Sequence, residues 1–265
     1  MQNSKSCDRE VTIKMTPAHP TKVRTDLNPA RILTFKINDI DVTGREDETI
    51  LKIAQQKGIY IPTLCHLEGL SERGACRLCI VEVKGIPKLL PSCITYCKEG
   101  MEVVTDSERV VNFRKKIVEL LFTERNHICS VCVSNGHCEL QNLALALGVT
   151  HIEYPYRSPK FSVDATHQRF VADHNRCVLC SRCIRVCGEV EGAHTWNFMG
   201  RGISARVITD LDQPWGTSET CTSCGKCVHV CPTGALSEKG KSVAEMEKRR
   251  QFLPYLQLMR REDLK

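Results

Sequence analysis

CVLCSRCIRVC, residues 177–187, spaces four cysteines as C-x2-C-x2-C-x3-C, and CTSCGKCVHVC, residues 221–231, repeats that spacing. Three thiolates at three-residue intervals on a tight loop bind three corners of a cubic [4Fe–4S] cluster. The fourth thiolate lies on the next segment and reaches the neighbouring cluster. A structural zinc site instead uses two separated cysteine pairs around one ion, and two quadruplets of this form do not match that pattern. The two runs therefore predict a pair of [4Fe–4S] clusters.

Each cluster of this pair is expected to take three ligands from one run and its last ligand from the other. One set is Cys177, Cys180, Cys183 and Cys231, and the other is Cys221, Cys224, Cys227 and Cys187. Pro232 completes the second run, whereas Gly188 stands at the matching position of the first run. That departure leaves every thiol in place.

A second group of cysteines, residues 65–93, has the spacing C-x10-C-x2-C-x13-C and contains Cys65, Cys76, Cys79 and Cys93. The plant-type [2Fe–2S] pattern is C-x4-C-x2-C…C, so the first gap here is longer. Gly69 and Gly74 lie in this loop, and glycines let backbone amides approach cluster sulfurs. The group predicts a [2Fe–2S] cluster; the alternative is a zinc site on a small sheet domain.

A third group, ERNHICSVCVSNGHCELQ, contains Cys129, Cys132 and Cys138, one thiolate short of a complete ligand set. The candidates for the fourth ligand are His127, His137 and a group outside the run. A lone histidine is more often a surface or core residue than a ligand, but this one stands among spaced cysteines. We expect His127, because it precedes the run and can close the loop, whereas His137 adjoins Cys138 and would point elsewhere.

The groups use all but two of the 17 cysteines, and we expect the remaining Cys7 and Cys97 to be free thiols. The chain of 265 residues has no apolar run long enough for a membrane span and no apolar signal segment at its N-terminus. We therefore expect a cytoplasmic protein whose thiols are kept reduced and bind metal rather than forming disulfides.

The formal net charge of +6 counts every cysteine as neutral. Three all-thiolate clusters at about −2 each and a histidine-ligated one at about −1 bring about −7 in all. The loaded protein is then near neutral, and its composition gives no reason to expect a nucleic-acid partner.

Hydrophobic patterning predicts an α+β protein. RILTFKIN alternates as a strand with Leu33, Phe35 and Ile37 on its buried face, and DETILKIAQQKG indicates a short helix ending at Gly58. CIVEVKG and MEVVT suggest further strands. A longer helix is expected in SERVVNFRKKIVELLFTE, capped by Ser107 or Asp106, and another in CELQNLALALG. The apolar face of the longer helix is expected to contain Val110, Phe113, Ile117, Leu120 and Leu121.

The expected domains follow the cysteine groups. They are a flexible extension (1–30), a [2Fe–2S] domain (31–105), a helical domain with the Cys3His cluster (106–150), a connector (151–175), a double [4Fe–4S] domain (176–240) and a charged tail (241–265).

The order of these motifs resembles a known set of iron–sulfur proteins over residues 31 to about 240. The set comprises the N-terminal parts of the complex I large iron–sulfur subunit and of [FeFe] hydrogenases, and the HoxU-type small diaphorase subunits of NAD-reducing [NiFe] hydrogenases. The stretches most similar to the HoxU type are IPTLCHLEGLSERGACRLCIVEV, NHICSVCVSNGHCELQ, DHNRCVLCSRCIRVC and QPWGTSETCTSCGKCVHVCPTGAL. In complex I the ligating histidine lies four residues before its first cysteine; Arg125 stands there here, and the NHxC form containing His127 is that of HoxU-type sequences.

The resemblance implies a β-grasp ferredoxin-like domain, a small helical domain and a bacterial-ferredoxin-like domain. It also implies a non-catalytic electron-transfer subunit between an NAD(H)- and FMN-binding diaphorase subunit and the small and large subunits of a [NiFe] hydrogenase, with ferredoxin as a further candidate partner. The chain has no G-x-G-x-x-G run after a strand, so the flavin and nicotinamide are expected on a partner.

Two alternatives remain open at this point. The same relay would suit an NAD-linked formate dehydrogenase, an electron-bifurcating hydrogenase or a complex I-like enzyme. The clusters could instead only staple the fold of a structural or nucleic-acid-binding module.

Overall fold

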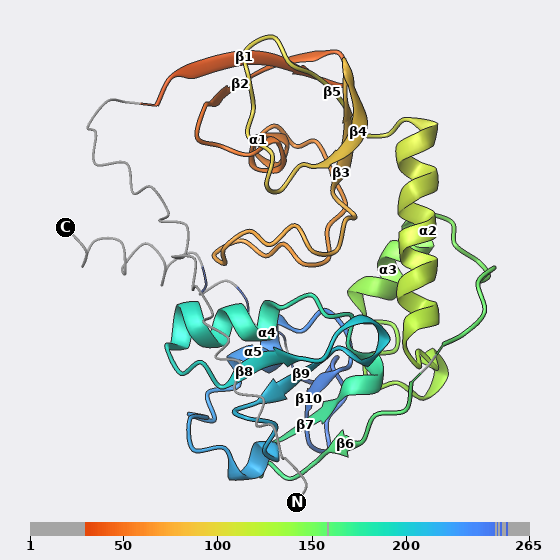
Figure 1. The fold of residues 1–265 in the computed structure, drawn as a ribbon, viewed down its shortest axis with the longest axis vertical. Coiled ribbons are helices and arrows are strands. Elements are labelled where there is room, and N and C mark those ends of the chain that lie inside the picture. Colours follow the sequence, from red (N-terminus) through yellow and green to blue (C-terminus); the bar gives the residue numbers. More distant parts are fainter. Residues whose placement is uncertain (1–29, 158, 247, 249, 251–252, 254–265) are drawn as a thin grey trace, which may run out of the picture. The chain divides into compact units, whose positions relative to one another are not determined.

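The computed structural model describes residues 30–157, 159–246, 248, 250 and 253. The expected N-terminal extension, with Cys7, and most of the expected charged tail lie outside these residues. In the described part, helices and small sheets alternate along the chain as an α+β fold (Figure 1).

A mixed five-stranded sheet in the order β2-β1-β5-β3-β4 forms the first described domain. Only β1 and β5 pair in parallel, and the other neighbours are antiparallel. The helix α1 packs on this sheet so closely that a Cβ added at Gly44 of β2 would overlap Ile53 of α1. This is the predicted β-grasp arrangement. Its elements are β1 (Ile32–Ile37), β2 (Ile40–Arg45), α1 (Ile50–Gln56), β3 (Ile80–Val83), β4 (Ile86–Pro91) and β5 (Glu102–Val104).

The alternation in β1 and the apolar face of α1 are confirmed. Leu33, Phe35 and Ile37 are buried, and α1 buries Ile50, Leu51, Ile53 and Ala54. A two-residue turn at Asn38 and Asp39, both with positive φ, joins β1 to β2. Such turns match the right-handed twist of a hairpin, and Asn and Asp tolerate the left-handed conformation.

The long helix α2 (Glu108–Glu124) begins after Ser107, whose hydroxyl accepts a hydrogen bond from the Val110 N–H. The predicted apolar face is partly wrong, because Phe113 and Leu120 are 49% and 50% exposed. Arg114 is turned inward instead, where its guanidinium donates to carbonyls of the sheet domain. Satisfying those buried carbonyls shifts the inward face by one position. The second predicted helix is α3 (Glu139–Ala146).

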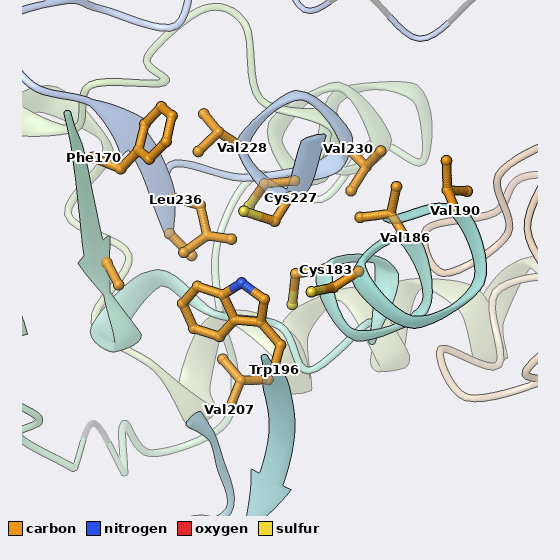
Figure 2. Packing of buried hydrophobic residues seen from close by; sticks show 14 of the residues in the cluster. Phe170, Cys183, Val186, Val190, Trp196, Val207, Cys227, Val228, Val230 and Leu236 are labelled. Carbon is orange, nitrogen blue, oxygen red and sulfur yellow. The ribbon is translucent and has the colours of Figure 1, made fainter. Parts of the chain in front are cut away.

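The second half of the described chain contains small sheets and very short helices around the cysteine runs. One sheet has the order β10-β7-β6, and β8 pairs with β9. Cys183 and Cys227 lie in the same buried cluster as Trp196, Val186 and Val228 (Figure 2). The elements are β6 (Val163–Asp164), β7 (Phe170–Asp173), α4 (Arg182–Arg185), η3 (Val186–Glu191), β8 (Trp196–Met199), β9 (Arg206–Thr209), α5 (Lys226–Val230) and β10 (Leu236–Glu238). Single 3-10 turns lie at η1 (Cys129–Val131), η2 (His174–Arg176), η4 (Gly202–Ser204) and η5 (Trp215–Thr217).

The difference between Gly188 and Pro232 has a structural consequence. After Cys187 the chain continues as the π-helical turn η3, which contains Gly188. After α5 the chain is extended at Cys231, with ψ 124°, because a residue before proline disfavours the helical region. The two runs thus have similar ligand loops. The chain continues from the first loop into the helical turn η3, and from the second in an extended conformation toward β10.

Candidate iron–sulfur cluster sites

The two cysteine runs meet in the crossed combinations predicted from their spacing. One cavity is lined by Cys177, Cys180, Cys183 and Cys231. A separate cavity is lined by Cys187, Cys221, Cys224 and Cys227. Seven of these thiols are buried or half-buried, whereas Cys224 is exposed. Each set thus surrounds its own cavity and suits a four-iron cluster by the number and softness of its donors.

Left-handed backbone positions shape the loops that carry these thiols. Leu179 and Ser181 have φ 52° and 61°, and Ser223 in the second run has φ 55°. The first loop turns so that the Leu179 N–H points to Cys177 Sγ at 3.4 Å. Backbone N–H groups directed at sulfur stabilise the negative charge of a thiolate cluster.

The third predicted site is a cavity lined by His127, Cys129, Cys132 and Cys138. The His127 ring is hydrogen-bonded to the Leu121 backbone, while its Nε2 is buried and has no hydrogen-bond partner among the described residues. Burial lowers the pKa of His127 to about 4, so the ring is neutral. A ring with one nitrogen on a backbone carbonyl and the other free is how histidine binds metal.

The other histidine candidate is placed differently. His137 is exposed and does not line this cavity. Arg125, at the position of the complex I ligand, is buried and donates to the carbonyls of Ile203 and Ala205. Its guanidinium also lies 4.7 Å from the centre of the Phe161 ring. Arg125 therefore holds the 203–205 segment against the end of α2 and does not line the third cavity.

Gly234, in the CPTG stretch after the second run, borders the third site. A Cβ at this position would lie 2.9 Å from Cys132 Sγ and 3.1 Å from the Ser134 hydroxyl. The Pro232 carbonyl accepts a hydrogen bond from the Glu139 N–H at the start of α3. The third site is thus built against the end of the second cysteine run.

In the first domain, Cys65, Cys79 and Cys93 are buried and Cys76 is half-buried. The thiols hydrogen-bond in pairs, Cys65 with Cys76 and Cys79 with Cys93. These bonds lower the pKa of Cys65 to about 5 and of Cys79 to about 7, and they raise the pKa of each partner. The N–H groups of Ala75 and Cys76 also point at Cys65. The four donors form one closely packed set, as a [2Fe–2S] cluster requires.

In the other sites burial raises the pKa of Cys138, Cys177, Cys180, Cys183 and Cys227. The pKa is about 12 for Cys177 and about 11 for Cys180 and Cys138. Metal binds the thiolate, so loading these sites releases protons and is favoured at higher pH. Among the described residues, no group of three or more His, Cys, Asp or Glu side chains is arranged to hold a single metal ion.

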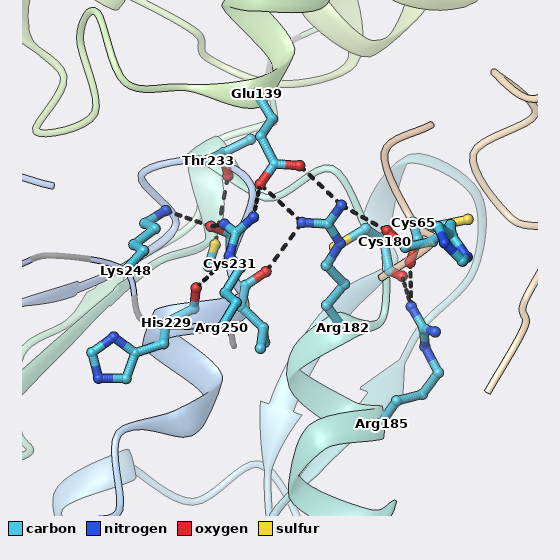
Figure 3. A network of polar contacts seen from close by, with 12 residues as sticks. Cys65, Glu139, Cys180, Arg182, Arg185, His229, Cys231, Thr233, Lys248 and Arg250 are labelled. Atoms are coloured by element: carbon cyan, nitrogen blue, oxygen red, sulfur yellow. Dashed lines mark hydrogen bonds and ion pairs between the residues drawn. The ribbon is translucent and has the colours of Figure 1, made fainter. Parts of the chain in front are cut away.

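Buried arginines join the first domain to the cysteine runs (Figure 3). Arg182 donates to Glu139 of α3, to the His66 carbonyl at 2.8 Å and to the Val230 carbonyl at 3.4 Å. Arg185 donates to the carbonyls of Cys65, Ser71 and Cys180. The loop that begins at Cys65 is thereby fixed to α4.

Sequence reasoning missed these two arginines. The signal lay inside the motif itself, because CSRCIRVC places two cations between buried thiols. Buried cations need partners, which here are backbone carbonyls and one carboxylate. Cys97, the leftover thiol inside the described residues, is buried and donates to the Arg45 carbonyl at 3.1 Å, and it belongs to none of the four sets.

Three family models match successive parts of the chain. Residues 30–108 match a 2Fe-2S iron-sulfur cluster binding domain, and residues 114–153 match the NADH-ubiquinone oxidoreductase-G iron-sulfur binding region. Residues 169–237 match the ferredoxin-like domain of NADH-quinone oxidoreductase subunit 3.

Curated relatives include subunit alpha of the NADPH-Fe(3+) oxidoreductase of Geobacter sulfurreducens, which is 36% identical over 208 residues, 78% of this chain and 24% of the relative. HndD of the NADP-reducing hydrogenase of Solidesulfovibrio fructosivorans is 38% identical over 218 residues, 78% of this chain and 36% of the relative. Subunit gamma of the NAD-reducing hydrogenase HoxS of Cupriavidus necator is 29% identical over 208 residues, 78% of this chain and 87% of the relative. The chain therefore spans about a quarter to a third of the first two relatives and most of the third.

A chain in the crystal structure of NAD+-reducing [NiFe]-hydrogenase in the H2-reduced state has a TM-score of 0.75 and 33% identity, covering 83% of this chain and 93% of that one. The fold and the matching domains define an iron–sulfur protein with 2Fe-2S and 4Fe-4S binding domains. The chain belongs to the family of iron–sulfur electron-transfer subunits that complex I-like oxidoreductases and NAD-reducing hydrogenases share, with HoxS subunit gamma (HoxU) among its members. In the described part of the chain, no helix combines the length and apolarity that a membrane crossing needs.

Proposed function

We propose that this chain relays electrons between an NAD(H)-oxidising flavoprotein subunit and a [NiFe] hydrogenase module, in either direction. When bound, the clusters supply one-electron transfer. The residues of the chain hold the clusters, exclude water and set the local charge. The chain contributes no catalytic residue of its own in this proposal.

The proposed cluster content is one [2Fe–2S] and three [4Fe–4S] clusters. The ligand sets are those predicted from the sequence: Cys65, Cys76, Cys79 and Cys93; His127, Cys129, Cys132 and Cys138; Cys177, Cys180, Cys183 and Cys231; and Cys221, Cys224, Cys227 and Cys187. The proposed domains keep the limits 31–105, 106–150 and 176–240.

One observation carries the proposal. Each of the three predicted four-iron sets lines a cavity of its own, and in one of them the buried, unpartnered Nε2 of His127 would supply the donor that three cysteines lack. A fold held together by zinc would instead need each set of four donors to be arranged tetrahedrally around one ion. The hydrogenase partner is supported by the likeness to the chain in the [NiFe]-hydrogenase structure, which extends over most of both chains.

The test is metal and activity analysis of the complex that carries a natively tagged copy of this chain, purified without oxygen. We expect about 14 iron atoms per copy, nickel, and H2-dependent reduction of NAD+. Iron together with molybdenum or tungsten and formate oxidation would keep the relay and refute the hydrogenase partner. Iron near zero would refute the relay itself.

A relay to an oxidoreductase other than a [NiFe] hydrogenase is the second candidate, because subunit alpha of an NADPH-Fe(3+) oxidoreductase is 36% identical to this chain over 208 residues. The catalytic metal of the purified complex separates the two candidates. The relay residues proposed here are the same in both.

Replacing one ligand separates a relay from a structural staple. Cys224 is exposed and is not part of the buried cluster, so in Cys224→Ser a relay loses most H2-dependent NAD+ reduction while the subunits still assemble, whereas a staple loses assembly. Cys97→Ser is the matched control, since Cys97 is buried but lies outside all four sets. It should leave iron content, activity and assembly unchanged.

A further inference from the structure

The two tryptophans of the chain both serve the second of the paired sites. The Trp215 indole N–H donates to Cys221 Sγ at 3.3 Å. Trp196 hydrogen-bonds to the Cys227 thiol, and Figure 2 shows its indole nitrogen on the side of the ring that faces Cys227. Both side chains are almost completely buried, with exposures of 1% for Trp215 and 3% for Trp196. These sulfurs thus receive two side-chain N–H donors from almost fully buried rings.

The first of the paired sites has no such donors at the corresponding positions. Trp215 precedes Cys221 by six residues, and Val171 precedes Cys177 by the same interval. Trp196 follows Cys187 by nine residues, and Gly240 follows Cys231 by the same interval. The nearly repeated cysteine runs are therefore embedded in non-repeated surroundings.

The first site has other means of stabilising negative charge. The cations Arg182 and Arg185 lie close enough to influence Cys180, and the Leu179 backbone N–H points at Cys177. The Thr233 hydroxyl lies 3.8 Å from Cys231 Sγ, but its proton is used on the Arg176 carbonyl at 2.8 Å. The first site thus has arginine charges near its thiols, and the second has two indole N–H donors on its sulfurs.

The indole groups cannot turn away from the sulfurs, because their rings are packed on every side. Trp215 contacts the rings of His167, Phe170 and Trp196, with centroids 4.9, 5.4 and 4.9 Å away. The Trp215 backbone N–H is also bound to the Asp164 carboxylate at 2.7 Å. The donors are therefore preorganised, and no reorganisation is needed when an electron arrives.

We propose that Trp196 and Trp215 are positioning residues that raise the reduction potential of the cluster bound by Cys187, Cys221, Cys224 and Cys227. Hydrogen bonds to cluster sulfurs favour the reduced state, because reduction adds negative charge that the N–H groups stabilise. This inference rests on the ligand assignment of the proposed function. The exposure of Cys224 makes the tuned cluster the one of the pair with a thiol at the surface.

The variants Trp196→Phe, Trp215→Phe and the double variant test this proposal, because phenylalanine keeps an aromatic ring but removes the N–H. Potentiometric titration of the purified complex, followed by EPR, reads the potential of each cluster. In the double variant we expect the reduced-to-oxidised ratio of this cluster to fall about tenfold at a fixed potential, a shift of about 59 mV for a one-electron couple. The reduction potentials of the other three clusters should not change.

Phe170→Leu is the matched control, since it disturbs the ring packing around Trp215 but keeps both indole N–H groups. It should leave the potential unchanged. An equal shift in Phe170→Leu would overturn the proposal, because packing rather than the N–H groups would then set the potential.

A measurement on the unaltered protein covers the case in which a variant loses its cluster. With 15N-indole labelling, pulsed EPR of the reduced cluster should show nitrogen coupling from the two tryptophans. A reduced cluster without that coupling, or a double variant whose potential is unchanged, overturns the tuning and leaves the relay intact. Four iron atoms missing from the wild-type count, with Cys224→Ser unaltered, would instead refute the ligand assignment itself.

Discussion

The sheet domain at residues 31–105 and the double cysteine unit at residues 176–240 stabilise their cores by different means. The first packs mainly aliphatic residues and Phe35 between a five-stranded sheet and α1, with the ligands Cys79 and Cys93 in the same cluster. The second has helices of four and five residues, α4 and α5, and ligand cysteines within its buried cluster. Helices this short have no stability of their own. A regular fold can therefore form around one cluster site, whereas the other region needs its cofactors to complete a core.

Ligand loops in both regions hold non-glycine residues in the left-handed region, with Arg77 (φ 59°) in the first. Leu179, Ser181 and Ser223 are such residues on the ligand loops of the second. Each such residue costs on the order of 1 kcal/mol and persists only where its surroundings enforce it. In the double cysteine unit that enforcement falls to the metal bonds.

The largest expected effect is that of iron removal. After anaerobic chelation, hydrogen exchange should accelerate about 100-fold or more in residues 177–187 and 221–231, because binding free energy there is folding free energy. Amides of β1 and α1 should change by less than about threefold, since their core is already closed. An equal acceleration of hydrogen exchange in both regions would show that the sheet domain depends on its cluster as much as the double cysteine unit does.

The second largest effect is expected in the sheet domain. Phe35→Ala removes a side chain that is 1% exposed and should cost the sheet domain about 3–5 kcal/mol, through lost transfer energy and a cavity. Native-state hydrogen exchange of β1 and β5 measures it. Protection in residues 221–231 of the iron-loaded protein should stay as it was, and a comparable loss there would show that the two regions unfold together.

Arg182→Met tests the contacts that hold the sheet domain against the double cysteine unit. It removes the donors to Glu139 and to the carbonyls of His66 and Val230, and should cost about 2–3 kcal/mol, because these buried acceptors lose their partner. Arg250, which also pairs with Glu139, limits the loss. Urea unfolding of the iron-loaded chain checks the value. Arg45→Met, in an exposed pair with Asp47, is the control and should show no measurable change.

The smallest effect is a pH dependence from His167, whose pKa is lowered by burial and by the nearby Arg169 and Lys239 charges. Its Nδ1 accepts the backbone N–H groups of Arg169 and Phe170, which protonation would displace. The unfolded chain then binds more protons, so this histidine makes stability fall as pH drops below the unfolded pKa of about 6.5. His167→Asn should show a smaller difference between urea midpoints at pH 7.5 and 5.5 than the wild type. An identical difference would exclude His167 as the source.

Local pattern was enough to predict the elements whose periodicity and packing agree. The alternation in β1 and the Ser107 cap of α2 are confirmed. The pattern failed where one inward polar side chain overrode it, as Arg114 does by turning toward three carbonyls and leaving Phe113 exposed.

The strands β2, β4 and β6–β10 were not predicted. Those of the second half are two to four residues long, too short for a period to show.

Within the sites, cysteine spacing predicted which thiols share a cavity, because ligand loops are local and their pairing follows a known rule. The partners that come from elsewhere in the chain could not be found this way. Trp196 reaches Cys227 over 31 positions, and Arg185 contacts the Cys65 carbonyl 120 positions away. No spacing within a motif encodes such contacts.

The long first gap of the N-terminal motif has a kinetic consequence. Ten residues separate Cys65 from Cys76, compared with four in plant-type ferredoxins, and the carbonyls of His66 and Ser71 in that gap accept bonds from Arg182 and Arg185. A ferredoxin with the short loop is a diffusing carrier and meets each partner in a second-order encounter, typically at about 10⁵–10⁷ M⁻¹s⁻¹. Here the extra residues dock the first site onto the next. In the proposed relay, transfer between the two sites is a first-order step within one chain, and this docking fixes the separation on which its rate depends.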